Sequence, residues 1–303
     1  TPRLFDKNFT MNRFYALNWQ LMKSLSLNYK ADVMARIEEP YGKLDNKEKR
    51  DSVKEQFYNF GKMTRFNQDA QLTYNVPLEK IKPLDWMSLT TRYGATFTWD
   101  QAPPATSYIG NTIANSADKS LTGNLNMIKL YNKSKALRSI NQGRPPDKKK
   151  KKDEKKDKGK GDDNNKEEKK KDELNSFHYF LRGIMMVRNI NFSYTKRDAM
   201  ILPGFNRNVD FVGNNFNWNT PGLPFAFGEQ DPNKRYELAA AGFLSDDKRL
   251  ISPFTINSSQ TINMRSTIEP IKDFRIDLTF EQTYSENTVG QFKYDTTEGF
   301  NDF

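Results

Sequence analysis

The chain has 303 residues, of which 36% are hydrophobic and 28% charged, and its formal net charge is +10. No run of residues approaches the ~20 consecutive apolar positions that a membrane-spanning helix needs, and the absence of cysteine excludes a disulfide framework or a thiolate metal site within this chain. Residues 144–173 hold 14 Lys/Arg and 10 Asp/Glu, so +4 lies there and +6 remains for the rest of the chain. That mild bias predicts no nucleic-acid partner.

Alternation of apolar and polar residues is the dominant pattern, and it indicates strands with one apolar and one polar face. At residues 65–76, Phe66, Leu72 and Tyr74 alternate with polar side chains such as Asn67 and Thr73. In chain order the pattern predicts eight strands: 9–21, 24–33, 65–76, 85–99, 119–127, 190–196, 256–268 and 274–284. Most are longer than the usual strand of about 5–6 residues and suit the ~9–11 residues of a tilted strand that crosses a bilayer.

Short and long connections alternate between these strands. Short turns are expected near residues 22–23, 77–84 and 269–272, and long connections at about 35–64, 100–118 and 199–255. Outer-membrane barrels have short turns on one side and long loops on the other. We therefore predict an all-β fold, an antiparallel meander that forms part of a transmembrane β-barrel, with short helical and disordered insertions. The connection at 128–186 departs from the rule.

The predicted organisation has three parts. Residues 1–127 hold five barrel strands and a loop helix near 46–60, for which Asp45 is the expected cap, Glu48 completes a capping box and Gly61 follows the end. Residues 128–185 hold a helix at about 128–140 and the lysine-rich insert at about 144–173, whose composition cannot bury enough apolar surface to become ordered. Residues 186–303 hold three strands and the long loop 199–255.

Aromatic residues near the strand ends have two interpretations. Trp19 and Tyr74 lie near short turns, and Trp99 and Tyr284 lie near long loops. They could form the two aromatic girdles of a membrane barrel, or they could simply pack a core. A soluble β-sandwich would also place apolar residues on one face of each strand, so this alternative stays open.

The sequence offers little material for catalysis. His178 is the only histidine, and no nucleophile-elbow, phosphate-loop or zinc-protease motif occurs. The acid pairs Glu38-Glu39 and Asp246-Asp247 fall in predicted loops without an evident partner. The run Lys148–Lys152 is interleaved with nearby acids, which argues against a phosphate-binding stripe. We predict no catalytic, cofactor-binding or metal-binding residues and no enzymatic activity.

Glycine, proline and aromatic residues concentrate in the long loop. An ordered loop of this kind packs with its own side chains, and in a barrel it could fold into the lumen or only cover the rim. The residues singled out here are Leu202, Pro203, Gly204, Phe205, Asp210, Phe211, Gly213, Pro221, Gly222, Phe225, Phe227, Gly228, Gln230 and Asp231.

These loop strings, together with Pro83-Leu84-Asp85-Trp86, Asn111–Ser116 and Leu130–Lys133, carry a family resemblance. Over roughly residues 60–290 the chain resembles the Sov/SprA family, the outer-membrane translocon of the type IX secretion system in Bacteroidetes, which serves gliding motility and adhesin secretion. Val212 stands where a second aromatic residue is expected, and the lysine-rich insert has no counterpart in the resemblance.

The resemblance implies a bacterial outer-membrane location and a chain that is one piece of a longer protein. It also implies that the strands are part of a very large barrel, which exports folded cargo proteins bearing C-terminal signal domains. The implied partners are outer-membrane lipid, a PorV-type partner barrel and a periplasmic plug protein. No cofactor is implied.

A translocon needs a polar lumen and no catalytic residue. The alternation predicts that the polar rows line it, namely Asn67, Asp69, Gln71, Thr73, Arg92, Arg275, Asp277 and Glu281. Two other functions share the strand pattern: an outer-membrane transporter or receptor for small solutes, and a soluble β-rich binding module at the cell surface.

Overall fold

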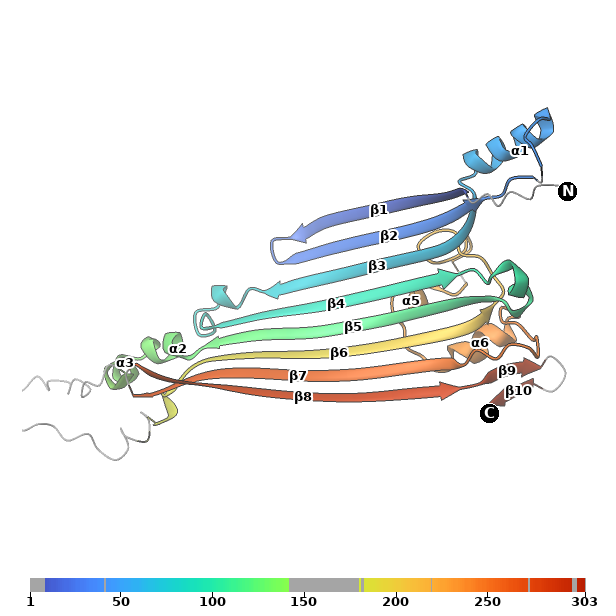
Figure 1. Cartoon of the computed structure of the whole chain (residues 1–303). Helices are drawn as coiled ribbons and strands as arrows, with labels where there is room; N and C mark the ends of the chain where they lie inside the picture. The colour runs from blue at the N-terminus through green and yellow to red at the C-terminus, as the bar shows by residue number, and fades with distance from the viewer. Residues whose placement is uncertain are drawn as a thin grey trace, which may run out of the picture.

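The fold, seen in a computed structural model, is a sheet of eight long antiparallel strands that pair in chain order (Figure 1). The structure describes residues 9–40, 42–141, 180, 183–218, 220–271, 273–295 and 299–302. The strands are β1 (Phe9–Met22), β2 (Leu25–Ile37), β3 (Lys62–Val76), β4 (Met87–Asp100), β5 (Asn111–Asn126), β6 (Val187–Phe205), β7 (Phe254–Ile271) and β8 (Phe274–Gly290). The predicted antiparallel meander is confirmed.

All eight predicted strands are present, but β5 and β6 are much longer than predicted. β5 begins at Asn111 instead of residue 119, and β6 continues to Phe205 instead of ending near residue 196. Small and polar residues such as Asn115 and Ala117 interrupt the apolar row there, so the alternation is weak in the sequence although the pairing of β5 with β6 continues. The predicted long connection at 100–118 shrinks accordingly, and the long loop begins at residue 206.

The predicted helix near 46–60 is α1 (Lys47–Tyr58), and its ends differ from the prediction. Asn46, not Asp45, caps it, with its side-chain oxygen accepting a hydrogen bond from the Glu48 amide at 3.4 Å. At the other end both Phe60 (φ 61°) and Gly61 (φ 71°) have left-handed backbones. The Gly61 amide donates to the Gln56 carbonyl at 2.7 Å, a closure common at helix C-termini.

The predicted helix at 128–140 is two helices. α2 (Met127–Lys133) and α3 (Lys135–Asn141) are separated at Ser134, whose extended backbone (φ −96°, ψ 130°) breaks the helical path. The smaller elements are η1 (Leu78–Lys80), η2 (Pro104–Ile109), α5 (Leu223–Ala226), α6 (Lys234–Ala240) and an unpredicted two-stranded sheet of β9 (Phe292–Asp295) and β10 (Gly299–Asp302). His178, Lys148–Lys152 and the insert at 144–173 lie outside the described residues.

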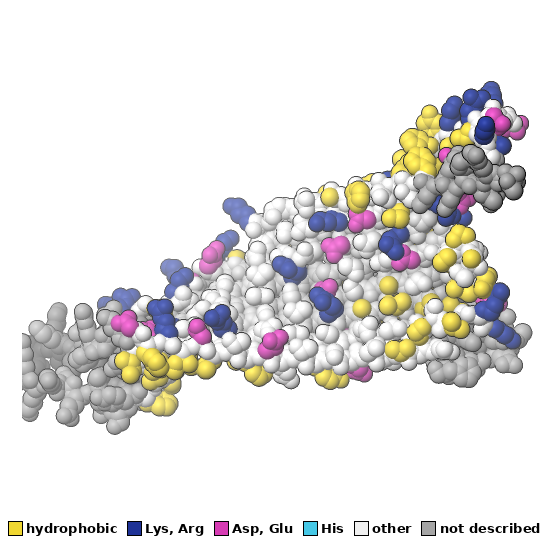
Figure 2. Space-filling model, in the orientation of Figure 1, with side chains coloured by type: hydrophobic (Ala, Val, Ile, Leu, Met, Phe, Trp, Pro, Cys, Tyr) yellow, Lys and Arg dark blue, Asp and Glu magenta, His cyan; other side chains and the backbone are white. Residues whose placement is uncertain are grey.

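The sheet has two chemically different faces, because residues that pair directly across antiparallel strands point to the same side. One row crosses all eight strands without an apolar residue: Gln20, Ser26, Thr73, Arg92, Ser120, Thr195, Thr261 and Thr283. We call this side the polar face; Phe14 and Met34 are among its few large apolar residues. Figure 2 views it, and uncharged polar atoms with scattered charges cover most of the strands. The opposite side is the apolar face.

The sheet is open. β1 and β8 lie at opposite margins (Figure 1), and among the described strands these two do not pair with each other. The long loop 206–253 packs on the apolar face at the end of the strands away from the short turns, and the main hydrophobic core lies between this loop and β2–β7. None of the described helices has the length and apolar character needed to span a membrane.

Candidate functional site

The polar face contains all eight residues that the alternation assigned to a lumen. Asn67, Asp69, Gln71 and Thr73 follow one another on the same side of β3, and Arg92 of β4 pairs directly with Thr73. Arg275, Asp277 and Glu281 occupy the same side of β8, four strands away from β4. The structure therefore places the set on one surface but in two groups, and a role in lining a lumen stays a prediction.

Some of the charges on the polar face form cross-strand pairs. Arg197 of β6 pairs with Asp118 of β5. Asp277 lies 3.4 Å from the Arg265 guanidinium and accepts a hydrogen bond from Thr267 Oγ1 at 2.7 Å. Exposed pairs of this kind add little stability, but they leave the surface polar and locally close to neutral.

The apolar face exposes large hydrophobic side chains near the short turns. Trp19 is 56% exposed, Leu278 51% and Leu72 37%, although they belong to the apolar row of their strands. We call this surface the apolar belt; it comprises Leu17, Trp19, Leu21, Leu72, Tyr74, Leu89, Ile190, Phe192, Tyr194, Ile262, Met264, Ile276, Leu278 and Phe280. Exposed apolar surface of this extent marks an interaction site or a membrane contact.

A polar zone crosses the apolar face at mid-length of β5–β8. Lys119 pairs with Lys196, and Asp198 lies 3.4 Å from the Lys196 ammonium and accepts from Ser258 Oγ at 2.7 Å. Beyond the zone the same row becomes apolar again with Met200 and Leu202, which are fully buried under the long loop. The apolar face therefore consists of an uncovered belt, a polar zone and a covered region.

The covered region binds the loop through polar side chains that stand in the apolar row. Gln68 Nε2 donates to the Ala226 carbonyl at 2.8 Å, and Tyr93 Oη donates to the Phe227 carbonyl at 2.7 Å. Asn115 Nδ2 donates to the carbonyls of Phe225 (2.9 Å) and Glu229 (2.7 Å). Three adjacent strands thus hold the loop segment 225–229 by its main-chain carbonyls.

Apolar packing completes this contact. Phe225 of the loop is fully buried and meets Phe97 of β4 edge-on, with ring centroids 6.1 Å apart. Gly213 (φ 68°) lies so close to the same ring that a Cβ atom there would be 2.6 Å from Phe97 Cδ1. Gly228 (φ 91°) also needs glycine, because a Cβ atom would be 3.0 Å from the Ser116 carbonyl.

The remaining predicted loop residues divide between this contact and the loop surface. Pro203, Gly204 and Phe205 are buried at the end of β6, whereas Phe211 and Asp231 are exposed. Gln230 joins the contact through a 3.0 Å hydrogen bond from its Nε2 to Asn115 Oδ1. Pro221 and Gly222 precede α5, and the Gly222 amide donates to Asn214 Oδ1 at 2.8 Å.

The structure bears on two questions that the sequence left open. The loop packs on the apolar face, so it does not fold over the polar rows that were assigned to the lumen. Trp99 is 1% exposed beneath the loop and donates from Nε1 to the Arg207 carbonyl at 3.0 Å, so it packs a core and is not a girdle residue. Sequence reasoning missed Gln68 and Asn115, and the available signal was their polar character at apolar positions of the alternation.

A second polar contact within the loop region fixes its outer end. Arg249 binds Asp247 through its guanidinium and lies over the Tyr108 ring, 3.6 Å from the centroid. The hydrogen bonds from the Arg249 side chain and amide lower the pKa of Asp247 to about 2. Of the acid pair Asp246-Asp247 singled out in the sequence, Asp247 therefore has an arginine partner.

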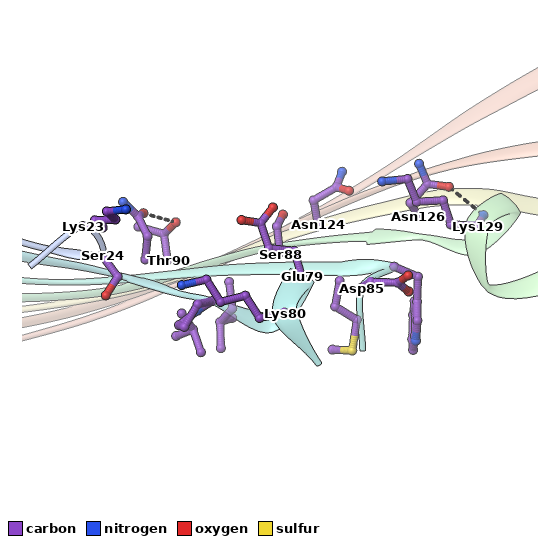
Figure 3. Close-up of a pocket in the computed structure, with 16 residues that line it drawn as sticks. Lys23, Ser24, Glu79, Lys80, Asp85, Ser88, Thr90, Asn124, Asn126 and Lys129 are labelled. Carbon is purple, nitrogen blue, oxygen red and sulfur yellow. Dashed lines mark hydrogen bonds between the residues drawn. The ribbon is translucent and has the colours of Figure 1, made fainter. Parts of the chain in front are cut away.

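The short-turn end carries a polar recess of about 520 Å³, formed by the ends of β3–β5 and the turn between β1 and β2. Figure 3 shows Ser88, Thr90 and Asn124 on its wall, and Lys23, Lys80 and Lys129 also line it. Lys133 of α2 forms an ion pair with Asp85, which ties the 77–86 turn to that helix. The Tyr131 hydroxyl donates to the Val187 carbonyl at 3.1 Å, and burial raises the pKa of Tyr131.

Among the described residues, no group of three His, Cys, Asp or Glu side chains could hold a metal ion. Neither a protein-family model nor a curated protein matches the chain.

Proposed function

We propose that this chain is part of the wall of a transmembrane β-barrel in the bacterial outer membrane, and that the barrel conducts proteins. The observation that carries the proposal is the pairing of a continuous polar face with an exposed apolar belt on the other side of the same strands. Water on one face and lipid on the other would satisfy both surfaces.

The size of the belt supports a membrane contact. On β8 the outward apolar row extends from Phe274 to Tyr284. Eleven residues at about 3.4 Å each, tilted by about 45°, cover roughly 25 Å, the height of the apolar band of outer-membrane barrels. The flanking Lys119 and Lys196 of the polar zone then lie where headgroups and water begin.

The open sheet supports a wide barrel. Eight strands that closed on themselves would leave an interior filled by side chains, whereas here β1 and β8 stay apart at opposite margins. Unpaired strand edges invite association, so further strands are needed to complete the wall. A wide lumen suits folded cargo better than a small solute.

The chemistry of the polar face suits a protein conduit. Short hydroxyl and amide side chains form most of the residue row that crosses the eight strands and includes Thr73. Charges such as Arg197 and Asp118 are paired. Such a surface offers no large apolar patch to retain a passing protein. On the resemblance to type IX translocons, the cargo carries C-terminal signal domains, a PorV-type barrel and a plug protein are partners, and the short-turn recess faces the periplasm.

The orientation of the two faces can be tested with single cysteines, because the chain contains none. Thr73→Cys and Leu72→Cys are a matched pair of neighbours on β3 that point to opposite faces. In a cysteine-free full-length protein in outer membranes, a water-soluble maleimide should modify Cys at 73, and only a lipid-soluble maleimide should modify Cys at 72. Equal reaction of both positions with the water-soluble reagent would refute the membrane wall and favour a soluble sheet.

Protein conduction needs its own test. Depletion of the full-length protein should leave cargo with C-terminal signal domains in the periplasm while uptake of small solutes stays normal. Normal secretion combined with lost solute uptake would contradict the translocon and favour a small-solute transporter.

A further inference from the structure

A row of polar and aromatic side chains crosses the apolar face at the polar zone. The cross-strand pairs place its members in the order Tyr93 (β4), Lys119 (β5), Lys196 (β6), Gln260 (β7) and Tyr284 (β8). We call these residues the lysine row. On β6 the belt residue Tyr194 lies on the short-turn side of the row and Asp198 lies on the long-loop side. The lysine row therefore marks the border at which the apolar belt ends.

The two lysines of the row stand directly opposite each other on neighbouring strands. Like charges in this arrangement repel and cost stability. Asp198 compensates one of them, because its carboxylate lies 3.4 Å from the Lys196 ammonium. Lys119 forms no ion pair within the part of the chain that the structure describes. Two ammonium groups and one carboxylate leave a net charge of +1 at this site.

Two further acids lie in this region, and neither pairs with Lys119. Glu286 of β8 is separated from Asp198 by Ser258 of β7, and it accepts a hydrogen bond from Tyr284 Oη at 3.3 Å. Glu229 belongs to the loop segment held by β5, and its buried Oε2 has no hydrogen-bond partner among the described residues. The extra positive charge on β5 is therefore left for a group from outside the described chain.

Both ammonium groups can be reached from outside. Lys119 is exposed, and the side chain of Lys196 is 36% exposed. Directly opposite residues have Cβ atoms about 4.5–5.5 Å apart, and lysine is a compact charge on a flexible stem. One phosphate can therefore accept charge-assisted hydrogen bonds from both lysines.

We propose that Lys119 and Lys196 together bind a phosphate of lipid A in the outer leaflet of the membrane. The proposal rests on the proposed membrane wall, with its long loops outside the cell. In that orientation the belt ends at the lysine row on the outer side, where the phosphorylated headgroups of lipid A begin. Tyrosine rings such as Tyr284 are typical of headgroup depth, and clustered basic side chains bind anionic lipid headgroups. The acyl chains of the same lipid lie along the belt at Tyr194.

Site-specific photocrosslinking in the full-length protein tests this site. A phenylalanine that bears a benzophenone replaces either Tyr194, beside the lysines, or Phe280, a belt residue of β8. The protein is placed in phosphatidylcholine nanodiscs with a trace of lipid A. The measured ratio is the lipid A crosslinked at position 194 divided by the lipid A crosslinked at position 280. Dephosphorylated lipid A is the headgroup control, and it should give a ratio at least tenfold lower.

Substitution of Lys119 tests the lysine contact. Lys119→Gln removes the uncompensated ammonium and leaves the pair of Lys196 with Asp198 in place. It should lower the ratio about fivefold, which is the contribution of one lysine near an anionic membrane surface. Lys119→Arg keeps the charge and should keep the ratio. The matched control is Lys30→Gln on the polar face of β2, opposite Asp69, which removes the same charge and should leave the ratio unchanged.

The outcomes separate the lipid site from the membrane wall. A ratio that is equal for both forms of lipid A, or that Lys119→Gln does not change, would overturn the site, while lipid crosslinks at position 280 would leave the wall intact. An absence of lipid crosslinks at both positions would overturn the wall itself. Loss of the preference in millimolar inorganic phosphate, or a crosslink from position 194 to a protein segment, would refute lipid A as the occupant.

Discussion

Asn115 of β5 joins the long loop to the sheet through three hydrogen bonds, which makes it a sensitive position for testing how the loop is held. Its Nδ2 donates to the carbonyls of Phe225 and Glu229, and its Oδ1 accepts from Gln230 Nε2. The side chain is 3% exposed. Asn115→Leu keeps a similar volume and removes all three bonds.

The cost can be estimated from what each partner loses. The Phe225 carbonyl still accepts from the Gly228 amide at 3.2 Å, so it keeps a donor. The Glu229 carbonyl loses its hydrogen bond from the Asn115 amide, and an unsatisfied buried group costs about 1–3 kcal/mol. The loss of the hydrogen bond between Asn115 and Gln230 adds about 1 kcal/mol. We therefore expect the loop to open more easily by about 2–4 kcal/mol.

Hydrogen exchange in the full-length protein measures this opening locally. At a factor of ten per 1.4 kcal/mol, amides of residues 222–230 should exchange roughly 30- to 700-fold faster in Asn115→Leu. The matched control is Ser116→Ala, which removes the 2.6 Å hydroxyl contact with Thr96 on the other face and should leave loop exchange unchanged. Exchange within threefold of wild type, or equal acceleration in the control, would refute the view that Asn115 holds the loop.

Two further predictions concern the belt and the outer end of the loop. Leu72→Lys puts a charge in the belt and should destabilise insertion by about 2–4 kcal/mol in the middle of a bilayer, whereas the protein with Thr73→Lys on the polar face should assemble normally. Heat-modifiable electrophoretic mobility of the outer-membrane fraction measures the assembly of both variants. Equal assembly of the two variants would contradict the assignment of the two faces. The pKa of Asp247 is lowered to about 2 from the usual 3.8, so its stabilising bond to Arg249 is complete above about pH 4 and is lost as pH falls toward 2. Exchange of residues 245–250, corrected for intrinsic rates, should rise over that range in wild type, and Asp247→Asn should show fast exchange without the pH step.

The strands were predictable from sequence because alternation is a local property, and the helices were predictable in position but not at their ends. β3 and β4 have clear apolar rows, with Phe66 and Phe97 as examples. At the α1 terminus the left-handed position falls on Phe60 before Gly61. Phe60 has a left-handed backbone, which the pattern at helix C-termini would predict for glycine. The Phe60 ring contacts Arg13, which is distant in the sequence.

The loop contact was not predictable, because alternation identifies an apolar face without identifying what covers it. Met200 and Leu202 fall in the predicted long connection at 199–255, yet in the structure they belong to β6, and loop residues more than twenty positions further along the chain bury them. Gln68 interrupts the apolar row of its predicted strand, and Asn115 falls in the predicted connection at 100–118. In the structure they are the side chains that satisfy the carbonyls of the loop.

The covered region follows from the length of the strands. β6 has 19 residues, and at about 3.3 Å per residue and a tilt of about 40° it rises roughly 48 Å, well beyond the ~30 Å hydrocarbon core of a bilayer. On the proposed function, the belt takes the part within lipid, and the projecting part of the apolar face would meet water. The loop removes that surface from water and lets the wall extend past the membrane without exposing Phe97, Met200 and Leu202. On the proposed function the loop is therefore a structural part of the wall, because its removal would expose a core and leave the polar face unchanged.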